Sequence, residues 1–83
     1  MIHIRFEQEK NRAAAYDNGT EVGECVFSPS GGAWIITHTY VAPSLGGMGI
    51  AAKLVDEVVR RADSSGIRII PRCSYAKRHL QKN

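Results

Sequence analysis

Apolar and polar residues alternate along the first half of the chain with the period of two that is typical of half-buried strands. The alternation predicts strands over residues 3–8, 12–16, 20–27 and 33–41, with a turn at 9–11. An Asn-Gly pair at 18–19 is a strong hairpin signal, and turn-forming residues fill positions 28–32. We therefore expect these four strands to pair mainly antiparallel.

The fourth predicted strand ends before Pro43, which cannot donate a hydrogen bond to a strand ladder. Regular alternation along this strand would place two sets of residues on opposite faces: Trp34, Ile36, His38 and Tyr40 on one, and Ile35, Thr37, Thr39 and Val41 on the other. After this strand the spacing of the apolar residues changes.

From residue 50 to residue 62 apolar side chains recur every three or four positions, and charged side chains fall on the opposite side. This pattern predicts an amphipathic helix packed on the sheet. Residues 64–66 end the helix, and residues 67–70 form a short apolar strand. A strand, helix, strand run of this length implies a parallel pair joined by a right-handed crossover. Ser74 is placed to cap a last helix that ends near Gln81.

A glycine-rich turn, SLGGMGI, connects the fourth strand to the helix. Gly46 and Gly47 are expected to adopt backbone conformations closed to residues with a Cβ, and Gly49 to let a ligand approach the first helical turn. The first N–H groups of a helix lack intrahelical partners and lie at the positive end of its dipole, so they can bind a phosphate. Taken alone, such a turn is equally compatible with an ordinary loop.

The order of these elements resembles the core of the GNAT acetyltransferase superfamily, and most closely its small single-domain branch of acetyltransferase-like, acetyl-CoA-binding proteins. That branch has the pattern HT-x-V-x-x-x-L-x-G-x-G-[IV]-[AG] followed by a P-x-C segment. The matching residues are His38, Thr39, Val41, Leu45, Gly47, Gly49, Ile50 and Ala51, then Pro71, Cys73 and Ser74. The superfamily usually has Gln or Arg where this chain has Gly46, so one side chain of the phosphate loop is absent.

The resemblance implies an α+β fold over residues 1–83: a mixed, mostly antiparallel sheet of about five strands, a central helix and a short C-terminal helix. It implies acetyl-CoA as cofactor, bound where the fourth and fifth strands splay apart. The pantetheine arm would follow Thr39, Tyr40 and Val41, and a backbone N–H near Val41 would polarise the thioester carbonyl. The phosphates would contact the turn and the first helical turn, that is Gly46, Gly47, Met48, Gly49, Ile50, Ala51 and Lys53.

Cys73 is the candidate nucleophile, because the resemblance places it near the acetyl group. Its thiolate would be favoured by a helix N-terminus and by the positive charges of Arg72 and Lys77. It would accept the acetyl group and pass it on. The alternative is an inert, small apolar residue. His38 is either a general base for an incoming amine or a histidine packed in the sheet. Tyr75 is similar in position to a tyrosine that protonates the departing CoA thiolate.

Composition narrows these possibilities further. At 83 residues the chain suits one domain with a small core, and it lacks the added helices and strands that shape the acceptor pocket of large GNAT enzymes. The two cysteines lack metal-ligand spacing, so we expect neither a disulfide framework nor a metal site. No segment has the length and apolarity of a signal peptide or a membrane span, so a soluble, cytoplasmic protein is expected.

Three functions remain open at this point. The first is an acetyl-CoA-dependent N-acetyltransferase that acts on an unidentified amine of a small molecule or a protein. The second is a module that binds acetyl-CoA or CoA with little turnover. A distant third is nucleic-acid binding, because the net charge is +3 and the residues after Gly66 are basic without any acidic residue. A monomer and a homodimer are both compatible with the sequence.

Overall fold

The structure is a computed structural model and describes residues 1–81. The elements follow in the order β1 (Ile2–Glu7), η1 (Gln8–Lys10), β2 (Arg12–Asp17), β3 (Thr20–Ser30), β4 (Ala33–Val41), η2 (Pro43–Leu45), α1 (Ile50–Ser64), β5 (Arg68–Pro71) and α2 (Ser74–Leu80). The strands lie side by side in the order β1-β2-β3-β4-β5. All neighbours are antiparallel except β4 and β5, which are parallel. The predicted fold class is confirmed.

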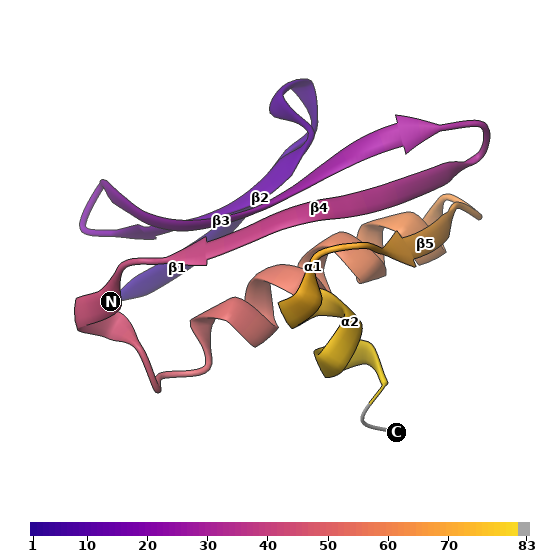
Figure 1. Cartoon of the computed structure of the whole chain (residues 1–83). Helices are drawn as coiled ribbons and strands as arrows, with labels where there is room; N and C mark the ends of the chain where they lie inside the picture. Colours follow the sequence, from indigo (N-terminus) through magenta and orange to yellow (C-terminus); the bar gives the residue numbers. More distant parts are fainter. Residues whose placement is uncertain (82–83) are drawn as a thin grey trace.

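Both helices lie on one face of the sheet, and α1 runs beneath its strands (Figure 1). Within the described residues no helix is long and apolar enough to cross a membrane. We call the helix-covered side of the sheet the inner face and the opposite side the outer face. The inner face carries the apolar core, and the outer face carries a network of charged side chains.

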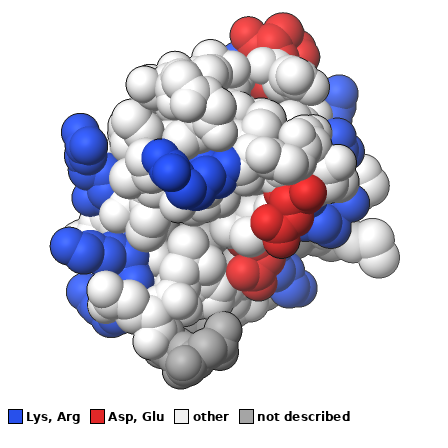
Figure 2. All heavy atoms as spheres, turned by 90° about the vertical axis from the view of Figure 1, so that its right-hand side faces the viewer, with Lys and Arg blue, Asp and Glu red and all other residues white. Residues whose placement is uncertain are grey.

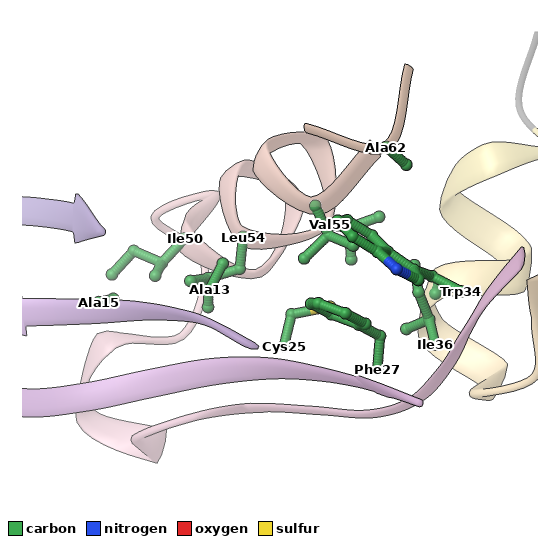
Figure 3. Packing of buried hydrophobic residues seen from close by; sticks show 12 residues of the cluster. Ala13, Ala15, Cys25, Phe27, Trp34, Ile36, Ile50, Leu54, Val55 and Ala62 are labelled. Carbon is green, nitrogen blue, oxygen red and sulfur yellow. The ribbon is translucent and has the colours of Figure 1, made fainter. Parts of the chain in front are cut away.

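The core fills the space between α1 and the inner face (Figure 3). The rings of Phe27 and Trp34 stack with centroids 4.1 Å apart, and Phe6 stacks on both at 5.9 and 5.8 Å. The apolar stripe of α1 is buried against these rings and strands through Ile50, Leu54, Val55, Val58 and Ala62. This packing holds the N-terminus of α1 in place beside the end of β4.

Strand β3 runs to Ser30, beyond its predicted end at Phe27 and through Pro29. The N–H of Phe27 donates to the carbonyl of Asn11, directly before β2, at 2.9 Å. The backbone of Pro29, two residues on, therefore also faces the β2 side of β3. β2 begins only at Arg12 and has no residue opposite Pro29, so the missing N–H of the proline leaves no ladder bond unmade. The predicted loop thereby shrinks to a tight turn.

A bulge in β4 changes which side chains share a face. Phe27 pairs with Ile36, while its neighbour Val26 pairs with His38, so Thr37 is an extra residue in β4. The prediction that His38 and Tyr40 share a face with Trp34 and Ile36 is therefore wrong. Beyond the bulge, Thr39 and Val41 lie on the inner face, and His38 and Tyr40 on the outer face.

The outer face carries a polar network centred on Arg12, whose side chain is only 11% exposed. Its guanidinium donates to Glu7 at 2.8 Å, to Glu21 at 2.9 Å and to Glu24 at 2.8 Å, and the Tyr16 hydroxyl donates to Glu7. The hydrogen bonds to carboxylates, that of Glu21 first, outweigh burial and raise the pKa of Arg12. The guanidinium therefore stays charged and joins three strands.

Candidate functional site

The glycine-rich turn enters α1 without a capping side chain. Gly49 is the N-cap residue with φ of 76°, and the first intrahelical bond runs from the Lys53 N–H to the Gly49 carbonyl at 3.2 Å. Within residues 1–81, the N–H groups of Ile50, Ala51 and Ala52 make no hydrogen bond outside the helix, and the helix offers them no acceptor. The start of α1 therefore presents free backbone donors at its positive end.

A hollow of about 280 Å³ lies directly beside these donors. It is lined by the end of β4, the turn, the first turn of α1 and α2, through Val41, Leu45, Gly46, Gly47, Gly49, Ile50, Ala51 and Tyr75. A Cβ on Gly47 or Gly49 would meet no protein atom within 4 Å, so both face open space. Two of the predicted phosphate contacts are not among its lining residues: Met48, which is 57% exposed, and Lys53, an exposed residue one turn into α1.

The structure contradicts the predicted conformation at only one of the three glycines. Gly47 has φ of 84° and needs the left-handed region, as expected. Gly46 has φ of −62° and ψ of 148°, an extended conformation open to any residue, so its predicted conformational role is wrong. Gly49 has a left-handed φ of 76°, so substitution there would strain the backbone as well as fill space.

A larger hollow of about 410 Å³ lies at the β1 and β2 end of the sheet. Its lining is Met1, His3, Arg5, Tyr16, Asn18 and Gly19. It includes none of the predicted site residues and no free helix terminus. We therefore place the candidate site at the smaller hollow, where the turn, β4 and α2 meet.

Strands β4 and β5 separate before β4 reaches the hollow at Val41. Their pairing ends at Ile36 and Pro71, and the carbonyl of Ile36 then accepts from the N–H groups of both Arg72 and Cys73 at 2.9 Å. Beyond this point β5 has left the sheet and the chain turns into α2. The rest of β4 keeps β3 as its only strand neighbour in the described part of the chain.

Backbone alternation shows which groups of β4 face the vacated edge. The N–H of Ala42 donates to the Val22 carbonyl of β3 at 2.8 Å, so Tyr40, two residues back, also faces β3. Thr39 and Val41 alternate with these residues and direct their backbone groups to the edge that β5 has left. An extended ligand can pair with such an edge as an added strand would.

Cys73 lies at the point where β4 and β5 separate. It is the N-cap residue of α2, in place of the predicted Ser74, and its sulfur accepts from the Ala76 N–H at 3.5 Å. Its Sγ is 3.4 Å from Thr39 Oγ1. Burial raises the pKa of Cys73, but hydrogen bonds from the Thr39 hydroxyl and from backbone N–H groups of Ala76, Tyr75 and Thr39 lower it more. The net lowering favours thiolate, whereas Arg72 and Lys77 are not among its main causes.

The structure brings Tyr75 to the site and takes His38 away from it. Tyr75 lines the hollow, and its ring stacks on His79 with centroids 5.9 Å apart. His79 in turn contacts Asp56 of α1 at 2.9 Å, which anchors this side of α2. His38 lies on the outer face, with Nε2 3.7 Å from Glu24 Oε2, and so does not share the side of the sheet on which Cys73 contacts Thr39.

The sequence reasoning missed Cys25. This residue lies opposite Thr39 in the β3–β4 pairing and is fully buried, with its Sγ 3.7 Å from Thr39 Oγ1. Only the pairing register across the bulge indicates this proximity. Both cysteines of the chain therefore contact the same threonine.

The chain is similar in fold to solved structures of other proteins. A crystal structure of a GCN5-related N-acetyltransferase from Sphaerobacter thermophilus is similar with a TM-score of 0.67 and 27% identity, over 72% of this chain and 20% of that one. A probable acetyltransferase from meticillin-resistant Staphylococcus aureus gives 0.65 and 14%, over 83% and 55% of the two chains. An acetyltransferase from Trypanosoma brucei gives 0.56 and 20%, over 80% and 55%.

The last two similarities show a shared fold, and the chain spans between 20% and 55% of the length of these three proteins. A search of curated proteins finds no match. The sequence model described as GCN5-related N-acetyl-transferase matches residues 5–83, nearly the whole chain. The chain therefore belongs to the GCN5-related N-acetyltransferase family.

Proposed function

We propose that this protein transfers the acetyl group of acetyl-CoA to an amine. The observation that carries the proposal is the continuity of three features: free amides at the start of α1, the vacated edge of β4, and Cys73 at the point where that edge begins. Phosphate, pantetheine arm and thioester occur in this order along acetyl-CoA. The chemistry of the donors along the site matches each part.

The phosphates would accept hydrogen bonds from the turn and from the first turn of α1, with Lys53 within one helical turn. Of the three residues expected to hold the pantetheine arm, Thr39 and Val41 direct their backbone groups to the open edge. Tyr40 directs its backbone to β3 and is half exposed on the outer face. Because the Thr39 N–H already bonds Cys73, the arm would pair with the Thr39 carbonyl and with Val41 as an added strand pairs.

The chemical step would use Cys73 as the nucleophile. Its thiolate attacks the acetyl carbonyl carbon, whose oxygen takes a hydrogen bond from a backbone N–H near Val41. The bond between that carbon and the CoA sulfur breaks, and the Tyr75 hydroxyl gives its proton to the departing thiolate. A neutral amine then attacks acetyl-Cys73, the Cys73 thiolate leaves, and the surplus amine proton returns to Tyr75. His38 has no role in this route, because it lies on the outer face.

A second function is compatible with the same site. The chain spans at most 55% of the length of the structural neighbours reported above, and the predicted site residues include binding residues for acetyl-CoA but none for an acceptor. The second candidate is therefore a module that binds acetyl-CoA or CoA and turns over little. Nucleic-acid binding has less support: on the face that Figure 2 shows, Lys and Arg lie in separate groups with uncharged surface and acidic side chains between them.

Mass spectrometry and CoA release together test the proposal. After incubation with acetyl-CoA, intact protein is expected to gain one acetyl group, and peptide mapping should place it on Cys73 and not on Cys25. Cys73→Ala should gain none. A panel of polyamines, lysine peptides and amino sugars should then release CoA faster than the blank in the wild-type protein only.

The outcomes separate the two functions. Calorimetric binding of CoA without release in the presence of any amine would favour the binding module. Rapid turnover that survives in Cys73→Ala would contradict the covalent route and leave direct transfer. Absence of CoA binding would contradict both.

A further inference from the structure

Thr39 lies between the two cysteines of the chain. Its Oγ1 is 3.4 Å from Cys73 Sγ and 3.7 Å from Cys25 Sγ, both within reach of a hydrogen bond to sulfur. The extra residue Thr37 is the reason for this position, because without the bulge Thr39 would lie on the outer face. The bulge therefore places one hydroxyl between two thiols.

The protonation states of the two cysteines determine the direction of the hydrogen bonds. Cys25 is fully buried, and burial raises the pKa of its thiol to about 11, so Cys25 keeps its proton at neutral pH. A hydroxyl has one proton to donate and lone pairs to accept. Once Cys73 is a thiolate it can only accept. With neutral Cys73, its S–H donates to Thr39 and the Thr39 O–H donates to Cys25. With Cys73 as a thiolate both bonds reverse, so that Cys25 S–H donates to Thr39 and Thr39 O–H donates to Cys73.

We propose that Thr39 is a positioning residue for Cys73: its hydroxyl, oriented by the buried Cys25 thiol, holds the Cys73 thiolate at the vacated edge of β4. This role rests on the proposed function, in which that thiolate takes the acetyl group. The contact transfers no proton and changes no bond order. Both cysteines are free thiols in the structure.

Other titratable groups lie next to Cys73 in the chain, on α2, and on elements that contact α2 or β4. They are Cys25 on β3, Asp56 on α1, Arg72 directly before Cys73, and Tyr75 and Lys77 on α2. Among the described residues none of these side chains makes a hydrogen bond or an ion pair with Cys73, whereas Thr39 does. Removal of the Thr39 hydroxyl therefore deletes one defined donor and leaves the charges around Cys73 in place.

The test is the pH dependence of Cys73 alkylation by iodoacetamide, which requires no acetyl-CoA. Thr39→Val keeps the shape of the side chain and removes the hydroxyl, and it should move the midpoint of the profile up by about one pH unit, the effect of one charge-assisted hydrogen bond. Thr39→Ser keeps the hydroxyl and should restore the wild-type midpoint. Cys25→Ala removes the second donor and should move the midpoint in the same direction by less, and Cys25→Ser should restore it. Cys73→Ala supplies the blank.

A purely structural role for Thr39 would change thermal stability without moving this midpoint. An unmoved midpoint in folded Thr39→Val would overturn the inference while leaving the proposed function untouched. If Thr39→Val moves the midpoint but the wild-type protein releases no CoA with any amine, the proposed function would be overturned and the role of Thr39 would stand. If Thr39→Val does not fold, the Cys25→Ala and Cys25→Ser pair decides, with equal midpoints in both counting against the role of Thr39.

Discussion

Two substitutions of Gly46 that carry opposite charges test directly whether the phosphates of CoA bind at the glycine-rich turn. Gly46 has an extended conformation that any residue adopts, and a Cβ there would meet only the Pro43 carbonyl, at 3.4 Å. It lines the hollow beside the start of α1. Gly46→Arg and Gly46→Glu should therefore both fold, and they differ mainly in the sign of the charge presented to the bound phosphates.

The expected magnitude follows from electrostatics at a partly exposed site. Unit charges about 5 Å apart interact by about 3 kcal/mol at an effective dielectric constant of about 20, and solvent exposure and salt reduce this to about 1 kcal/mol. Gly46→Arg should therefore tighten CoA binding about fivefold, and Gly46→Glu should weaken it about fivefold. The difference between the two variants should shrink as ionic strength rises.

Isothermal titration calorimetry of each variant with CoA measures this difference directly. Pantetheine, which lacks the phosphates, is the matched control and should bind both variants as it binds the wild type. Equal CoA affinity in the arginine and glutamate variants would refute the placement of the phosphates at the start of α1. A change of the same size for pantetheine would refute the electrostatic explanation.

Three further outcomes concern the stability of the sheet. Arg12→Met leaves three carboxylates without their shared counter-charge and should lower the free energy of unfolding by about 3 kcal/mol in urea at pH 7; an unchanged midpoint and slope would contradict this. The hydrogen bond from the Tyr16 hydroxyl is the main cause that lowers the pKa of Glu7. Ionised Glu7 therefore stabilises the folded state above about pH 4.5, and this contribution is lost as the pH falls below that value. Glu7→Gln should flatten the acid side of the profile of unfolding free energy against pH. A Cβ on Gly23 would lie 2.8 Å from the Tyr40 carbonyl, so Gly23→Ala should force β3 from β4 and lower the melting temperature, and an unchanged melting curve would show that the strands adapt.

Local spacing in the sequence was sufficient for most of the elements and for the glycine-rich turn. The period of two predicted four strands, and the change to a period of three to four predicted α1 from residue 50. Free amides at a helix start follow from helix geometry itself, together with the absence of a capping side chain near Gly49. These features depend on residues that are neighbours in the chain, so the chain alone was enough to find them.

Contacts between distant segments decided which side chains meet at the site. One extra residue at Thr37 moves every later side chain of β4 to the other face, which separated His38 from Cys73 and brought Thr39 to it. The bulge is a property of the pairing of β3 with β4, and alternation along β4 alone carries no sign of it. The same pairing brought Cys25 to Thr39. The chain by itself therefore determined the elements and the helix-terminal amides, and the tertiary pairing decided the set of residues around Cys73, because a strand's faces are defined only once its partner sets the register.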